Sequence, residues 1–184
     1  MDQITRKAIE LNKGPAGRAI AQPMEESLIH ALYEHITLER SASAQYLALS
    51  LWFAERELRG FAKFFEKESR EEMEHASSFC KYVVARGQTV VLDQLEKPNQ
   101  DYVSIQDIIS ETFQMEVDVT TSLQQIYSMA ERSNDARTTV FLDPVIEDQI
   151  KSEDYFAYLI GKVKFANENS SSILIIDNEL SSIN

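Results

Sequence analysis

The chain has 184 residues, a length that suits one domain, and its formal net charge of −12 at pH 7 disfavours nucleic acids and anionic membranes as partners. This acidity suits the attraction of cations, although it would equally keep the protein soluble. No apolar run reaches the roughly 20 residues that span a bilayer, the N-terminus has no signal-peptide-like stretch, and the single cysteine, Cys80, excludes an internal disulfide. We therefore expect a cytoplasmic protein.

Glycine and proline are scarce, and the long stretches without them predict an all-α protein. Residues 1–23 contain several of these helix breakers and are expected to form a loosely structured arm, so the folded domain is expected over 24–184. Apolar residues that alternate at spacings of three and four indicate packed helices. The expected helices cover about 24–54, 61–86, 104–133 and 135–165, and a short apolar helix follows over about 173–183.

The connections between these helices predict their topology. The links near residues 56–60 and 133–134 are short, so each joins antiparallel neighbours. The link over 88–103 could reach roughly 50 Å when extended, and a helix of about 26 residues is roughly 39 Å long. It can therefore cross the whole bundle and leave the second and third helices parallel. One long crossover in a four-helix bundle is the ferritin-like arrangement.

Each apolar seam has a polar interruption near its middle. The four helices contribute, in order, Glu39, then Glu72 with His75, then Glu116, then Gln149. Counting about 1.5 Å per residue from the connecting turns places these positions at similar levels of the bundle. Buried carboxylates without a compensating charge are very costly, and a metal cluster would supply that charge.

The spacing within the second helix supports a metal site, because residues three apart share a helix face. Glu72 and His75 form a Glu-x-x-His motif, and a di-iron bundle has two lone glutamates with two such motifs. Where the second motif would stand, the chain has Gln149 and Ser152. We therefore expect a weaker second iron position that binds iron, oxidises it and releases it.

At these residues the sequence resembles the non-haem ferritins from about residue 24 to the end, and most of all the bacterial ferritins of cyanobacteria. The resemblance is carried by the segments LERSASAQYL, FFEKESREEMEHA, FQMEVD, FLDPVIEDQIKSEDYFAYL and IDNELSSI. It implies a homo-oligomeric cage of about 24 subunits, with the short fifth helix near the fourfold axes. It also implies iron storage, with Fe(II) and O₂ or peroxide as substrates of a ferroxidase.

The resemblance implies a role for each polar seam residue. One iron would bind Glu39, Glu72 and His75, and the other would bind Glu116 with Glu72 as the bridge. Gln149 would be a hydrogen-bonding neighbour, as in the ferroxidase site of animal heavy chains. The resemblance also implies that Tyr46 lies beside the iron and can lend it an electron. In addition, Tyr46 would be an aromatic residue of the core.

Further acidic residues are candidates for the route that iron would take into the protein. Asp143 and Glu147 share a face at the start of the fourth helix, where acids are favoured by the helix dipole. The resemblance implies instead that they line threefold pores that admit Fe(II). Three residues of the second helix would extend the route to or from the iron: Glu68, Glu71 and Glu74. For Glu71 and Glu74 a solvated acidic face is the alternative.

The remaining candidates and alternatives are less specific. Met73 stands where bacterioferritins bind haem, but the missing second Glu-x-x-His favours interface packing over a haem cage. His30 and His35 are interpreted as ordinary helix residues, and Cys80 as a buried small apolar residue. The alternative functions are a di-iron oxygenase or peroxidase with another substrate, and a purely structural shell subunit.

Overall fold

The computed structural model describes residues 10–167 and 169–182, and in this part of the chain every regular element is a helix. Four long helices precede a short one, which confirms the predicted fold class. In chain order they are α1 (Glu26–Ala54), α2 (Arg59–Ala85), α3 (Ile105–Arg132), α4 (Ala136–Ala166) and α5 (Ser170–Ser181). None of these helices is long and apolar enough to cross a membrane.

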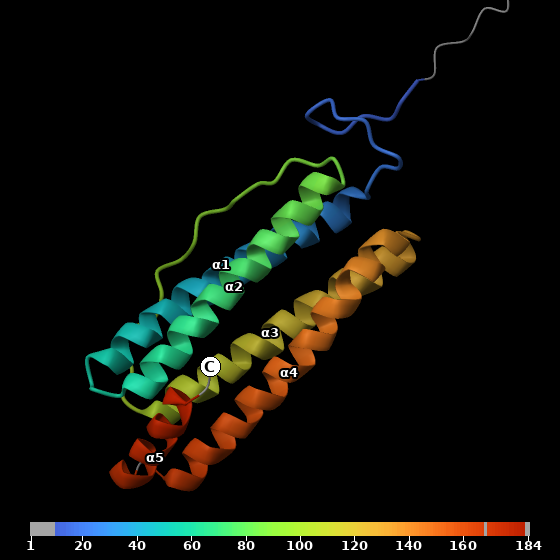
Figure 1. Cartoon of the computed structure of the whole chain (residues 1–184). Coiled ribbons are helices and arrows are strands. Elements are labelled where there is room, and N and C mark those ends of the chain that lie inside the picture. Colours follow the sequence, from blue (N-terminus) through green and yellow to red (C-terminus); the bar gives the residue numbers. More distant parts are fainter. Residues whose placement is uncertain (1–9, 168, 183–184) are drawn as a thin grey trace, which may run out of the picture.

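The helices form two antiparallel hairpins, α1–α2 and α3–α4, which lie along each other (Figure 1). An extended segment runs the length of the bundle from the end of α2 to the start of α3, so the predicted long crossover is present. At the end of the bundle where α3 begins, α5 turns back and packs mainly against α2. The second half of α5 therefore lies beside the first turn of α2, where Asp177 and Ser181 are close to Gly60.

Capping side chains explain where the helices begin. Ser104 accepts a hydrogen bond from the backbone N–H of Asp107 at the start of α3. Asp135 accepts one from the N–H of Thr138 at the start of α4. Asn169 caps α5, which is why this helix begins three residues before the predicted Ile173. The fourth helix continues through Pro144 without a break.

The described part of the N-terminal arm, residues 10–23, contains a turn held by a short antiparallel bridge between Lys13 and Ala19. It lies near the end of α2, where Arg18 donates a hydrogen bond to the carbonyl of Val84 over 3.1 Å. Residues 1–9 lie outside the described part of the chain. The division into an arm and a folded domain stays a prediction.

The buried core consists of two apolar clusters separated along the bundle axis. One lies toward α5 and is dominated by aromatic residues, among them Tyr46, Phe53, Phe61, Phe65 and Phe156. The other lies toward the opposite end and is mainly aliphatic, with Leu28, Leu32, Ile36, Leu123 and Leu142 among its members. On every long helix the polar seam residue falls between the members of the two clusters. The bundle therefore has a polar layer between two apolar layers.

Candidate metal centre

The polar layer is built by the middle turns of the four long helices. Glu39, Glu72, Glu116 and Gln149 come from α1, α2, α3 and α4 respectively, and all four are buried. Each follows the spacing of three or four that places apolar residues in the core, so the helix that packs the core also turns the polar side chain inward.

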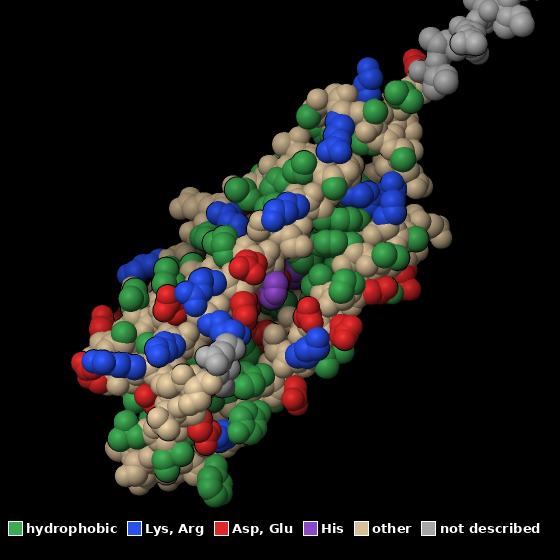
Figure 2. Space-filling model, viewed as in Figure 1, with side chains coloured by type: hydrophobic (Ala, Val, Ile, Leu, Met, Phe, Trp, Pro, Cys, Tyr) green, Lys and Arg blue, Asp and Glu red, His purple; other side chains and the backbone are tan. Residues whose placement is uncertain are grey.

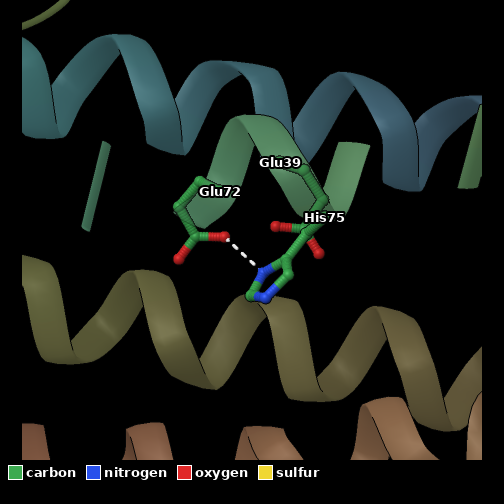
Figure 3. Close-up of side chains that lie close together, drawn as sticks. All are labelled: Glu39, Glu72 and His75. Atoms are coloured by element: carbon green, nitrogen blue, oxygen red, sulfur yellow. Dashed lines mark hydrogen bonds and ion pairs between the residues drawn. The ribbon is translucent and has the colours of Figure 1, made fainter. Parts of the chain in front are cut away.

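Three of the predicted ligands come together. Ligand atoms of Glu39, Glu72 and His75 all lie within 4.8 Å of one another, and Figure 3 shows these side chains converging from α1 and α2. Nδ1 of His75 lies 3.1 Å from Oε2 of Glu72, a contact between residues three apart on one helix. A carboxylate pair with an imidazole at this separation is a donor set that suits a divalent iron ion.

Glu116 lies outside that group of three donors and is held by hydrogen bonds to both carboxylate oxygens. The Tyr46 hydroxyl donates to Oε1 over 2.5 Å, and Nε2 of Gln149 donates to Oε2 over 2.9 Å. The Tyr46 ring is stacked on Phe156 at a centroid distance of 5.9 Å, which fixes the hydroxyl. The structure therefore places Tyr46, Glu116 and Gln149 in one hydrogen-bonded chain.

Burial dominates the electrostatics of the acids in this layer. It raises the pKa of Glu72 to about 8, and it raises the pKa of Glu39 and of Glu116 as well. The hydrogen bond with Glu72 raises the pKa of His75 to about 9. At neutral pH the layer therefore retains protons that a metal ion would displace.

The unpaired groups in the layer fit a cation. Oε2 of Glu39 is buried and has no hydrogen-bond partner among the described residues. No arginine or lysine is paired with Glu39, Glu72 or Glu116 in the described residues, so their negative charges lack a permanent compensating charge. A buried carboxylate oxygen without a partner is costly, and a bound divalent ion would remove that cost.

One face of the bundle gives access to the candidate centre. The His75 side chain is 44 % exposed, although Glu72 beside it is buried. Figure 2 shows histidine on this face between α2 and α4, with acidic side chains on both sides. Glu71 is partly exposed on α2, and Asp148 on α4 pairs with Lys151 over 2.7 Å. Glu68 is mostly buried one turn before Glu72, and burial raises its pKa to about 8.

The two histidines interpreted as ordinary helix residues differ in the structure. His30 is largely exposed and lies 3.8 Å from Glu26. His35 is fully buried, with Nε2 only 2.9 Å from Oε1 of Glu39 and Nδ1 2.9 Å from the Ser122 hydroxyl. The spacing of four between His35 and Glu39 could have predicted that these two residues are neighbours on α1. The contact between His35 and Ser122 could not be predicted in this way, because it depends on the packing of α3 against α1.

The other sequence candidates lie outside the polar layer. Asp143 and Glu147 are exposed on α4, and Asp143 accepts a hydrogen bond from the Tyr127 hydroxyl over 3.3 Å. Met73 is half-exposed on α2, where interface packing stays a prediction. Cys80 is a free thiol that is partly buried against the aliphatic cluster, so its predicted burial is confirmed only in part.

A four-helix bundle with one long crossover and a buried layer of glutamates with a histidine defines the class of ferritin-like carboxylate metalloproteins. The chain belongs to the ferritin family, because the family model described as the ferritin-like domain matches residues 29–166. This match confirms the predicted family. Together with the fold it supports a role in iron storage.

Curated relatives and solved structures agree with this assignment. The chain is 26 % identical over 160 residues to a bacterial non-heme ferritin of Escherichia coli, covering 87 % of this chain and 97 % of the relative. It is 27 % identical over 157 residues to that of Bacteroides fragilis, covering 85 % and 98 %. An open pore ferritin from the archaeon Archaeoglobus fulgidus superimposes with a TM-score of 0.85 at 26 % identity, covering 89 % of this chain and all of that one. The narrower likeness to cyanobacterial ferritins and animal heavy chains stays a prediction.

Proposed function

We propose that this protein oxidises Fe(II) at an intrasubunit di-iron centre and stores the resulting Fe(III) as mineral inside a cage of about 24 copies. The observation that carries the proposal is the convergence of Glu39, Glu72 and His75 in the buried polar layer. Glu116 extends the layer on α3, and it interacts electrostatically with Glu72. Iron is here the substrate and the cargo of the protein.

In this proposal each residue has a specific role. Glu39 and His75 hold the first Fe(II), Glu116 holds the second, and Glu72 bridges the two. Gln149 fixes Glu116 through its 2.9 Å hydrogen bond and adds no negative charge, so the second iron is held more weakly. Weak binding at that position suits a centre that must release its product to the cage interior.

The redox balance uses only the two irons and the oxidant. Each Fe(II) gives up one electron, and O₂ takes two electrons and two protons to become hydrogen peroxide. Peroxide as the oxidant would take two electrons and two protons to become two waters. If Tyr46, whose hydroxyl contacts Glu116, lent one of the two electrons in place of an iron, it would be left as a tyrosyl radical and that iron would stay Fe(II).

Exposed apolar groups at the α5 end support assembly into a cage. A cavity of about 540 Å³ lies between α4 and α5, and the Phe165 side chain beside it is 94 % exposed. Large exposed apolar groups of this kind are typical of surfaces that other subunits cover. In the cage, copies of Asp143 and Glu147 would meet at threefold pores and attract Fe(II).

The alternatives are weaker on the observed geometry. A di-iron oxygenase that keeps its metal is disfavoured because the fourth helix offers the neutral Gln149. A purely structural subunit does not explain why three acids are buried together in one layer with no arginine or lysine paired to them among the described residues.

The substitution Glu72→Gln tests the proposal. It keeps the shape of the side chain and removes the bridging charge, so rapid Fe(II) oxidation in air should fall by at least about 100-fold, while the particle keeps its size on a column. Glu66→Gln is the matched control, because Glu66 lies on the same helix but is exposed and paired with Arg70. Unchanged oxidation by Glu72→Gln would contradict the site.

A further inference from the structure

A histidine that the proposed iron ligands do not include lies directly behind one of them. His35 is fully buried in α1, one helical turn before Glu39. Its ring packs against Phe79 of α2 at a centroid distance of 4.4 Å, and Ser122 of α3 contacts its Nδ1. The ring is therefore fixed by three helices, and its remaining nitrogen, Nε2, faces the Glu39 carboxylate at 2.9 Å.

The two contacts of the ring determine which nitrogen can face Glu39 as a donor. The Ser122 hydroxyl can either donate or accept, so it can donate its hydrogen to Nδ1. That arrangement places the ring hydrogen on Nε2, toward Oε1 of Glu39. When Glu39 is ionised, as it must be to bind a metal ion, the opposite tautomer would put a lone pair of Nε2 against a carboxylate oxygen at 2.9 Å, which is repulsive.

The two oxygens of the Glu39 carboxylate have different surroundings. Oε1 is next to His35, whereas Oε2 is buried and has no hydrogen-bond partner among the described residues. Nε2 lies 2.9 Å from Oε1 without the alignment of a formed hydrogen bond, so the contact between them is electrostatic. A ligand carboxylate with a neighbouring donor on one oxygen keeps the other for the metal.

We propose that Ser122 and His35 form a positioning relay that holds Oε1 of Glu39 and reserves Oε2 as the iron donor. This inference deepens the proposed function and rests on it. His35 is a positioning residue, because it acts on the iron only through Glu39. The relay spans α1 and α3, so it also ties the first iron position to the packing between the two hairpins.

The test uses Co(II), whose visible absorption reports the ligand geometry, together with the intact oligomer. His35→Leu removes both hydrogen-bonding groups, and we expect Co(II) affinity at the tighter position to fall by about 10-fold with an altered spectrum. His35→Gln can still accept from Ser122 and donate to Glu39, so it should restore most of the affinity and the spectrum. Ser122→Ala should give a smaller loss, and the exposed His30→Gln should give none.

The outcomes separate this inference from the proposed function. No Co(II) binding by the unsubstituted chain would overturn the di-iron centre, and the relay with it. Normal binding by the unsubstituted chain with equal affinity and spectrum in His35→Leu would overturn the relay alone. A loss in His35→Gln as large as that in His35→Leu would also overturn it, because the imidazole itself would then be required. Column size and thermal unfolding of each variant identify any that fails to fold.

Discussion

Gln149 donates a hydrogen bond from Nε2 to Oε2 of Glu116 over 2.9 Å, at the level where a symmetrical di-iron bundle would have another acid. The Tyr46 hydroxyl occupies the other oxygen of Glu116. The carboxylate on the α3 side is thus held by two neutral donors, whereas Glu39 on the α1 side has an unpaired oxygen. In the proposed di-iron centre, this asymmetry predicts that the two irons bind with different strengths.

The substitution Gln149→Glu should reverse that asymmetry. A second acid beside Glu116 adds a ligand, so the weaker Co(II) step should tighten by roughly 10-fold. The metal-free protein should unfold at a lower temperature, because another buried carboxylate faces Glu116. Calorimetric titration and thermal unfolding measure the two effects. Gln149→Leu, which adds no charge, should not tighten the second step, and a tighter step there would contradict this explanation.

The acids of the polar layer should make the metal-free protein less stable as the pH rises. The pKa of Glu72 is raised to about 8 in the folded state, and that of His75 to about 9, so folding favours their protonated forms. Their stabilising contributions are complete below the unfolded pKa values, about 4.5 and 6.5, and are lost as the pH rises to about 9. The melting temperature should therefore fall between pH 6 and pH 9.

Thermal unfolding of the metal-free protein at both pH values checks this expectation, where each 1 kcal/mol corresponds to about 2–4 °C for a chain of this size. Glu72→Gln should reduce the fall, because it removes the acid and the partner of His75. Saturating Co(II) should reduce it as well, because the metal replaces the protons. A melting temperature that rises toward pH 9 would refute the expected protonation of the layer.

A buried ion pair joins the end of α2 to the turn between α3 and α4. Arg86 donates to both oxygens of Asp135, over 3.0 and 2.7 Å, and each side chain is only 7 % exposed. Burial alone would raise the pKa of Asp135, but the hydrogen bonds from Arg86 outweigh it and hold that pKa below its ordinary value.

Removing one partner of this pair should be costly. Arg86→Met removes the buried cation from Asp135 and leaves it with the Thr138 N–H and the more exposed Arg137, 3.9 Å away. The free energy of unfolding should therefore fall by up to about 3–5 kcal/mol. The double variant Arg86→Met with Asp135→Asn should lose less than the sum of the two single changes, because they share the interaction. Chemical denaturation measures all three variants, and strictly additive losses would show that the pair is not coupled.

Gly60 allows α5 to pack closely against the start of α2. A Cβ atom at Gly60 would lie 1.7 Å from the backbone oxygen of Asp177, and the Asp177 side chain accepts a hydrogen bond from the N–H of Phe61. Gly60→Ala should therefore displace α5 and reduce cage assembly, with most of the helix content retained. Size-exclusion chromatography with circular dichroism tests this. Lys63→Ala, an exposed change one turn later, should leave assembly intact, and a full cage in Gly60→Ala would contradict the role of α5.

The sequence was sufficient for the features that depend on one helix at a time. The alternating spacing of three and four predicted the helices to within a few residues, and the interruptions at Glu39, Glu72, Glu116 and Gln149 predicted the polar layer. Features that depend on contacts between helices could not be read in this way. The partner of His35 is Ser122, which is 87 residues away and has no distinguishing pattern around it.

The Arg86–Asp135 ion pair could not be predicted from the sequence either. Its residues are 49 positions apart, and nothing in the sequence shows that they are buried together. Cys80, which was predicted to be buried, is only partly buried for a related reason. The thiol lies on the edge of the buried face of α2, where a shift of one position along the helix decides exposure.

The most direct test of the di-iron centre is a titration of the metal-free protein with Fe(II) in air, following Fe(III) absorbance and O₂ uptake together with particle size. We predict a fast phase that saturates near two Fe(II) per chain, in a particle of about 24 chains. Oxidation no faster than in buffer, or a small oligomer that retains its iron permanently, would contradict a ferritin ferroxidase and favour a structural subunit or an oxygenase.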